Sequence, residues 1–106
     1  MKREIQPDLI AKIHMYPVAP TGRQGTFGDE YWPGLLQFAD GPPSEYWDIR
    51  LRLYEYGLLQ PGDTAEIPIK FLNWDTVKGE ARIGRQFYLG DPGKLGEGTI
   101  LKVLKP

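Results

Sequence analysis

The sequence predicts an all-β protein, a small six-stranded antiparallel β-barrel, and three observations lead to this class. Glycine and proline supply 13 and 10 of the 106 residues, about twice their usual combined share, which excludes a bundle of long helices. Apolar and polar residues alternate in short runs, a pattern typical of half-buried strands. Turn residues separate these runs at short intervals, which favours a barrel or a sandwich.

Six strand segments follow from this pattern, and the third is the clearest. In residues 47–54 apolar side chains alternate with polar ones almost without exception, so one face is expected to be buried. The fourth segment contains Pro68, which has no N–H for a ladder and therefore predicts a sheet edge or a bulge. The six expected strands are residues 8–16, 35–39, 47–54, 64–72, 81–89 and 98–104.

The connections complete the expected barrel. Residues 17–34 are rich in glycine and proline and have no periodicity, and residues 73–75 predict a corner. Pairing of the first strand with the last would close the barrel and remove its exposed edges, which brings Lys12 close to Lys102. The expected core residues are Ile10, Ile49, Leu51, Leu53, Ile67, Ile69, Phe87, Ile100 and Val103.

Length and composition indicate one domain over residues 1–106, with residues 1–7 as a flexible N-terminal tail. The absence of cysteine excludes disulfides and thiolate chemistry and favours a reducing compartment. The first residues contain no apolar core of a signal peptide, and no apolar run reaches the roughly 20 residues of a membrane helix. We therefore expect a soluble cytoplasmic protein without membrane contact, whose oligomeric state the sequence leaves open.

The net charge of −1 hides an uneven distribution. Residues 1–23 carry +2, residues 24–75 carry three basic and nine acidic groups for −6, and residues 76–106 carry +3. Barrel closure is expected to gather the basic groups on one side and the acidic segment on the other. RNA would then use the basic side, and a basic protein would be steered to the acidic side.

Tests for catalytic chemistry favour no enzyme, cofactor or metal. The pair Gly93–Lys94 lacks the spacing of a phosphate loop, and Leu95 stands where a hydroxyl would meet magnesium. His14 and Ser44 are the sole histidine and serine, and both are expected at the surface rather than in a nucleophilic triad. The carboxylates near loops are too sparse for a calcium loop and are more simply solvating charges: Asp29, Glu30, Glu45 and Asp48.

Binding remains, and its candidates concentrate in one irregular segment. Tyrosine, tryptophan and arginine are enriched at interface hot spots, and residues 22–33 contain all three types. The alternative is that the aromatic residues of 27–32 plug one end of the barrel. Trp74, at the expected corner, has the same two interpretations. The candidate binding residues are Arg23, Phe27, Asp29, Glu30, Tyr31, Trp32 and Lys94.

Several stretches, taken in order, resemble the C-terminal β-barrel domain (third domain) of translation elongation factor Tu and related translational GTPases. They are Leu9–Ile13; Gly22–Arg23 with Phe27, then Tyr31–Pro33 and Gln37–Phe38; Pro61–Asp63 before Glu66–Ile69; Phe87; and Lys94 with Gly96–Leu104. The resemblance spans about Asp8 to Leu104 and implies the barrel fold. In that family the domain follows a GTPase domain and a second barrel, and this sequence departs from the family in containing neither. No nucleotide hydrolysis is expected, because the phosphate loop is missing.

Two functions are therefore kept. One is a non-enzymatic, stand-alone binding module that docks onto a protein, with RNA as the other partner, because the family's barrel holds the aminoacyl-tRNA stem and meets exchange factors. The alternative is a bacterial immunity protein that neutralises a toxin by direct binding, which the acidic segment 24–75 favours.

Overall fold

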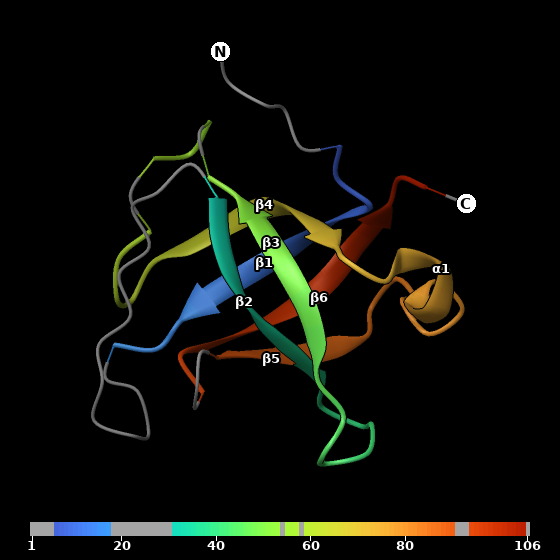
Figure 1. Cartoon of the computed structure of the whole chain (residues 1–106). Helices are drawn as coiled ribbons and strands as arrows, with labels where there is room; N and C mark the ends of the chain where they lie inside the picture. The colour runs from blue at the N-terminus through green and yellow to red at the C-terminus, as the bar shows by residue number, and fades with distance from the viewer. Residues whose placement is uncertain (1–5, 18–30, 54, 58, 91–93, 106) are drawn as a thin grey trace.

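Six antiparallel strands close into a barrel, as the sequence predicts, and the structure gives their order as β1-β4-β3-β2-β5-β6 (Figure 1). The computed structural model describes residues 6–17, 31–53, 55–57, 59–90 and 94–105. One short helix, α1 (Trp74–Val77), stands where a corner was expected. The strands are β1 (Leu9–Met15), β2 (Tyr31–Phe38), β3 (Trp47–Arg52), β4 (Thr64–Phe71), β5 (Gln86–Gly90) and β6 (Gly96–Val103).

The predicted pairing of the first strand with the last is confirmed. β1 pairs with β6 from Leu9 opposite Val103 to Met15 opposite Gly96, with one register shift between Ile10 and Ala11. On its other side β1 pairs with β4. Every strand of the closed barrel therefore has a hydrogen-bonded neighbour on each side. No edge of these described strands remains unpaired, and an unpaired edge is where another chain could add and start aggregation.

The core lies inside the barrel and contains most of the predicted residues. Two predictions need correction: Ile10 is half-buried rather than core, and Val103 is partly buried against the core. In β1 the inward positions are the odd-numbered ones, so Ile10 shares the outer face with Lys12. The buried residues of β1 are Leu9, Ala11, Ile13 and Met15.

β2 begins earlier than the predicted residues 35–39 and includes Trp32, Pro33 and Gly34. Pro33 is exposed and lies opposite Arg50, whereas Trp32 faces inward. The Trp32 ring covers Gly34, because a Cβ on this glycine would stand 2.0 Å from the ring. The glycine thus makes room for the indole inside the barrel, and a proline-glycine pair that suggested a loop belongs to a strand.

The predicted strand 81–89 is wrong over its first half, because β5 begins only at Gln86. Gly84 has φ +90°, donates to the carbonyl of Ile100 at 2.7 Å, and closes a turn in which Arg85 donates to Arg82 at 3.0 Å. Ile100 in turn donates to the carbonyl of Arg85 at 3.1 Å. Gly84 and Arg85 thus lie opposite the single residue Ile100, as in a glycine β-bulge. Regular pairing of β5 therefore begins only at Gln86.

Pro68 does not lie on an edge strand, which corrects one of the two interpretations predicted for it, a sheet edge or a bulge. β4 has β1 on one side and β3 on the other, and Pro68 lies opposite Ile10 of β1. The ladder between β4 and β3 pairs residues 69–71 of β4, so it stops at Ile69 and does not include the adjacent Pro68. A residue without an N–H is therefore accommodated where this ladder stops.

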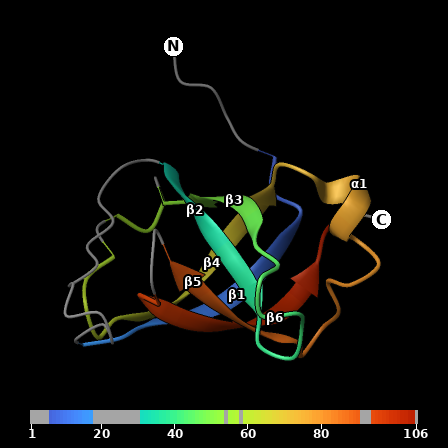
Figure 2. The ribbon, with the colours of Figure 1, turned by 60° about the horizontal axis from the view of Figure 1, so that its bottom comes forward.

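The strand directions define two ends of the barrel. At the loop end β1, β3 and β5 finish and β2, β4 and β6 begin. At the helix end the directions are reversed, and both views place α1 beside the carboxyl end of β6 and the C-terminus (Figures 1 and 2).

Candidate functional site

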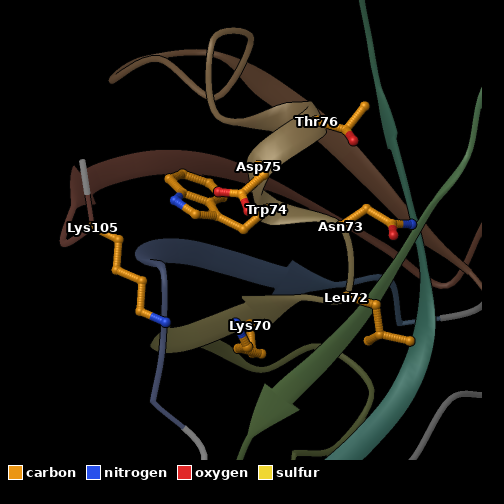
Figure 3. Close-up of a pocket in the computed structure, with 7 residues that line it drawn as sticks. All are labelled: Lys70, Leu72, Asn73, Trp74, Asp75, Thr76 and Lys105. Atoms are coloured by element: carbon orange, nitrogen blue, oxygen red, sulfur yellow. The ribbon is translucent and has the colours of Figure 1, made fainter.

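The helix end contains a hollow of about 450 Å³ between the end of β4, α1 and the C-terminal residues. Figure 3 shows the indole of Trp74 between α1 and the side chain of Lys105, with its nitrogen-bearing edge turned toward Lys105. Lys70 and Leu72, from the end of β4, form another part of the wall. The residues that line the hollow are Lys70, Leu72, Asn73, Trp74, Asp75, Thr76 and Lys105.

Both lysines of the hollow face one buried carboxylate, that of Asp8. Lys70 Nζ lies 3.4 Å and Lys105 Nζ 3.3 Å from the same oxygen, Oδ1. The other oxygen, Oδ2, accepts the backbone N–H of Phe71 at 2.7 Å. The carbonyl of Asp8 also accepts N–H groups of Leu104 and Lys105, so this residue fastens the start of β1 to β4 and to the C-terminal residues.

Trp74 is held in place by the core rather than displayed on the surface. Its side chain is only 7% exposed, and its ring packs against Phe71 with centroids 5.8 Å apart. The indole nitrogen is buried and has no hydrogen-bond partner among the described residues. Trp74 is therefore core, and its N–H is a buried donor that lacks an acceptor.

The loop end carries a second cluster, on the outer face of β1, β6 and β5. The hydroxyl of Tyr16 donates to Glu97 at 3.0 Å. Burial, followed by the hydrogen bond and charge of Glu97, raises the pKa of Tyr16 from 10.0 to about 12. The Tyr16 hydroxyl thus remains a neutral donor throughout the physiological range.

A cation and a histidine flank these two residues. Lys94 Nζ lies 3.9 Å from the centroid of the Tyr88 ring, and Tyr88 is opposite Glu97 in the β5–β6 ladder. His14 Nδ1 is 2.9 Å from the Thr64 hydroxyl, and its ring meets Tyr16 edge-on at 6.4 Å between centroids. We call Tyr16, Tyr88, Lys94 and Glu97 the loop-end cluster.

The predicted site residues are only partly located by the structure. Arg23, Phe27, Asp29 and Glu30 lie outside the described residues, and of Tyr31 only the backbone position at the start of β2 is described. The remaining two candidates are placed in different environments. Trp32 is 9% exposed and belongs to the core, so for this residue the plug interpretation holds, whereas Lys94 is exposed at the loop end.

Charges are mixed rather than separated into two faces on the described strands. Lys102 is opposite Ile10, two positions before Lys12, as barrel closure requires. However, Lys12 is opposite Glu66 of β4, and Arg50 is opposite Lys70 within the segment whose balance is acidic. On the described strands, basic and acidic side chains therefore do not separate into the two sides that the sequence predicts.

Sequence reasoning missed the hollow and most of the loop-end cluster. Tyr16 and Glu97 come from opposite ends of the chain and meet only through the β1–β6 pairing, as Asp8 and Lys105 do at the helix end. The predicted pairing of the first and last strands could have indicated these contacts, because the alternation of β1 and β6 determines which side chains share the outer face.

No model of a known protein family matches the chain, and no curated protein matches it. Among the described residues no group of three or more histidine, cysteine, aspartate or glutamate side chains could hold a metal ion. In the same part of the chain, no helix has the length and apolar character needed to cross a membrane.

Proposed function

We propose that this chain is a non-enzymatic binding module, a stand-alone barrel resembling the C-terminal domain of elongation factor Tu, that docks onto a protein through its loop end. The observation that carries the proposal is the loop-end cluster, in which two half-buried tyrosines are held in fixed positions, Tyr16 by Glu97 and Tyr88 under Lys94. The closed six-stranded barrel is compatible with the resemblance.

Fixed tyrosines suit a protein interface for a physical reason. Each offers a large amphipathic surface at little cost in conformational entropy, because its side chain is already ordered before binding. The segment 18–30, which joins β1 to β2, connects at the same end, and it contains the predicted binding residues Arg23, Phe27, Asp29 and Glu30. The cluster therefore lies at the end of the barrel where β1 ends and β2 begins.

A protein is favoured over RNA because of Glu97. This carboxylate is exposed and adjacent to both tyrosines, so it would repel a phosphate backbone approaching the same rings. Lys94 is the described cation of the cluster, and it is engaged with Tyr88. A protein partner can meet this mixed pair of charges with complementary groups.

The toxin-neutralising alternative rests on the acidic balance of residues 24–75, and three of the nine carboxylates of this segment lie near cations. Asp40 lies 2.9 Å from Arg85, and Glu55 lies 3.1 Å from Arg52. Glu66 faces Lys12 across the β1–β4 ladder. These carboxylates are offset by neighbouring cations rather than gathered for a basic partner.

The test is affinity capture from the native lysate with three forms of the chain. The wild type is compared with the double variant Tyr88→Ala/Lys94→Glu at the loop end and with Lys78→Glu on α1 as a matched charge reversal. Cross-linking and mass spectrometry identify what each form retains. We expect a protein retained by the wild type and by Lys78→Glu, lost with the loop-end variant, and cross-linked to the loop end.

Two further arms separate the alternatives. Nuclease treatment before elution should leave the retained protein in place, and its release would instead indicate an RNA partner. The double variant Asp29→Lys/Glu30→Lys should weaken capture of a basic toxin mainly through the association rate. Retention of the same proteins by the loop-end variant would refute docking through this surface.

A further inference from the structure

We infer that the hollow at the helix end is a second binding site, which takes a carboxylate of an acidic peptide segment with an apolar neighbour. It lies at the opposite end of the barrel from the loop-end cluster, so it goes beyond the proposed function. The donors are the ammonium groups of Lys70 and Lys105 and the indole N–H of Trp74.

The two lysines leave a local excess of positive charge. Two ammonium groups share one oxygen of a single carboxylate, Asp8, at 3.3 and 3.4 Å. These distances exceed the roughly 2.7–2.9 Å of a strong charge-assisted hydrogen bond, so each ammonium can turn toward a closer acceptor. Asp8 carries one negative charge shared by its two oxygens, of which the second accepts Phe71 N–H, so it offsets only one of the two ammonium groups. The other carboxylate that lines the hollow, Asp75, is exposed and lies 3.8 Å from Lys78 of α1, so it leaves this excess in place.

A further cation adds to this excess. Arg50 stands directly opposite Lys70 on the outer face of β3 and β4. Like charges at opposed positions of a ladder destabilise the sheet. Asp8 offsets part of this repulsion, and an anion bound beside Lys70 would reduce it further.

The buried N–H of Trp74 points to the same chemistry. An indole nitrogen that is desolvated without an acceptor raises the free energy of the folded state. Its side chain lines the hollow, and the nitrogen-bearing edge faces Lys105 (Figure 3). An oxygen placed between this edge and Lys105 would supply the missing acceptor and a countercharge together.

The walls favour a peptide carboxylate over a nucleic-acid phosphate. Single-stranded RNA gains much of its affinity by stacking bases on exposed aromatic rings, and Trp74 is 93% buried, its exposed fraction being 7%. Leu72 is 51% exposed at the wall and offers contact to an apolar side chain. A glutamate or aspartate flanked by apolar residues matches both features.

The experiment titrates the isotope-labelled full chain with a short capped peptide of alternating leucine and glutamate. Binding is followed by the indole N–H resonances, of which Trp74 is identified with the variant Trp74→Phe. The Trp74 resonance should shift saturably, and the matched leucine–glutamine peptide should leave it unchanged. Fluorescence anisotropy with the labelled peptide then gives dissociation constants for the variants.

Three variants separate a built site from a structural role. Lys105→Gln should weaken binding by about tenfold or more, the effect of losing one hydrogen bond to a charged group. Lys105→Arg should restore most of it, and Lys12→Gln, an exposed lysine of β1 that does not line the hollow, should have no effect. Thermal unfolding of each variant shows that the fold is retained.

Several outcomes would overturn the inference. They are the absence of a Trp74 shift at millimolar peptide, an equal shift with the glutamine peptide, and equal affinities for Lys105→Gln and the wild type. A shift produced by oligouridylate but not by the acidic peptide would assign the hollow to a phosphate backbone instead.

Discussion

Phe87 lies directly across the β5–β6 ladder from Gly98, and its ring occupies the space in which a Cβ on Gly98 would stand. Such a Cβ would come 2.4 Å from the ring carbon Cζ and 2.9 Å from the carbonyl oxygen of Lys12. An aromatic ring folded over a cross-strand glycine fills the inside of the barrel without widening it. The same arrangement recurs within β2, where the ring of Trp32 covers Gly34.

Gly98→Ala should therefore destabilise the barrel by about 1–3 kcal/mol, because the new methyl forces the Phe87 ring or the β1 backbone to move. Urea unfolding measures the effect. Gly79→Ala is the matched control, since nothing lies within 4 Å of a Cβ at that exposed glycine. Equal midpoints for the two variants would contradict the close packing of ring against glycine.

Gly84→Ala should destabilise the chain for a different reason. A Cβ on Gly84 has open space, but its φ of +90° lies in the left-handed region. Placing an L residue there costs about 1–2 kcal/mol. The loss should appear in urea unfolding, and amide exchange at Ile100 should quicken because this N–H pairs across the bulge. Unchanged stability would mean that the backbone turns differently at Gly84.

The strands that the sequence predicts well are those whose environment is uniform. β3 alternates cleanly because its inward residues are in the core or packed against it, whereas its outward residues are charged and exposed or half-buried. Residues 81–85 look like a strand, but Gly84 adopts a positive φ there, and Ile83 is 71% exposed in the resulting turn. Periodicity cannot detect a bulge that a single backbone angle creates.

For the binding candidates, residue type alone was not enough to predict where each side chain lies. Residue type alone marked Trp32 for binding, and its inward register in β2 places it in the core. The hollow depends on Asp8 and Lys70, which are 62 positions apart and meet only after β1 and β4 pair. The sequence predicts that the barrel closes, but it does not predict the register of each strand pair to within one residue. That register decides which side chains meet in the hollow.

Asp8→Ala should cost about 2 kcal/mol of unfolding free energy, because it leaves the buried N–H of Phe71 without an acceptor. Asp8→Asn keeps an oxygen for that N–H and should lose less. Lys70 and Lys105 are partly exposed, so water can solvate their charges in both variants. Chemical denaturation of the two variants measures the difference, and equal losses would show that the charge of Asp8 outweighs its hydrogen bond.

Tyr16 should make the barrel less stable in alkali. Its pKa, ordinarily 10.0, rises to about 12 in the folded chain, because burial and then Glu97 disfavour the phenolate. The folded state therefore holds the proton more tightly than the unfolded state does. The resulting stabilisation is complete below pH 10 and is lost as the pH rises through about 12. Urea unfolding between these limits should show a smaller decline for Tyr16→Phe, which has no proton to release, than for the wild type. Parallel declines for the two proteins would mean that the Tyr16 hydroxyl titrates alike in the folded and unfolded chains, and that its bond to Glu97 does not hold the loop-end cluster in place.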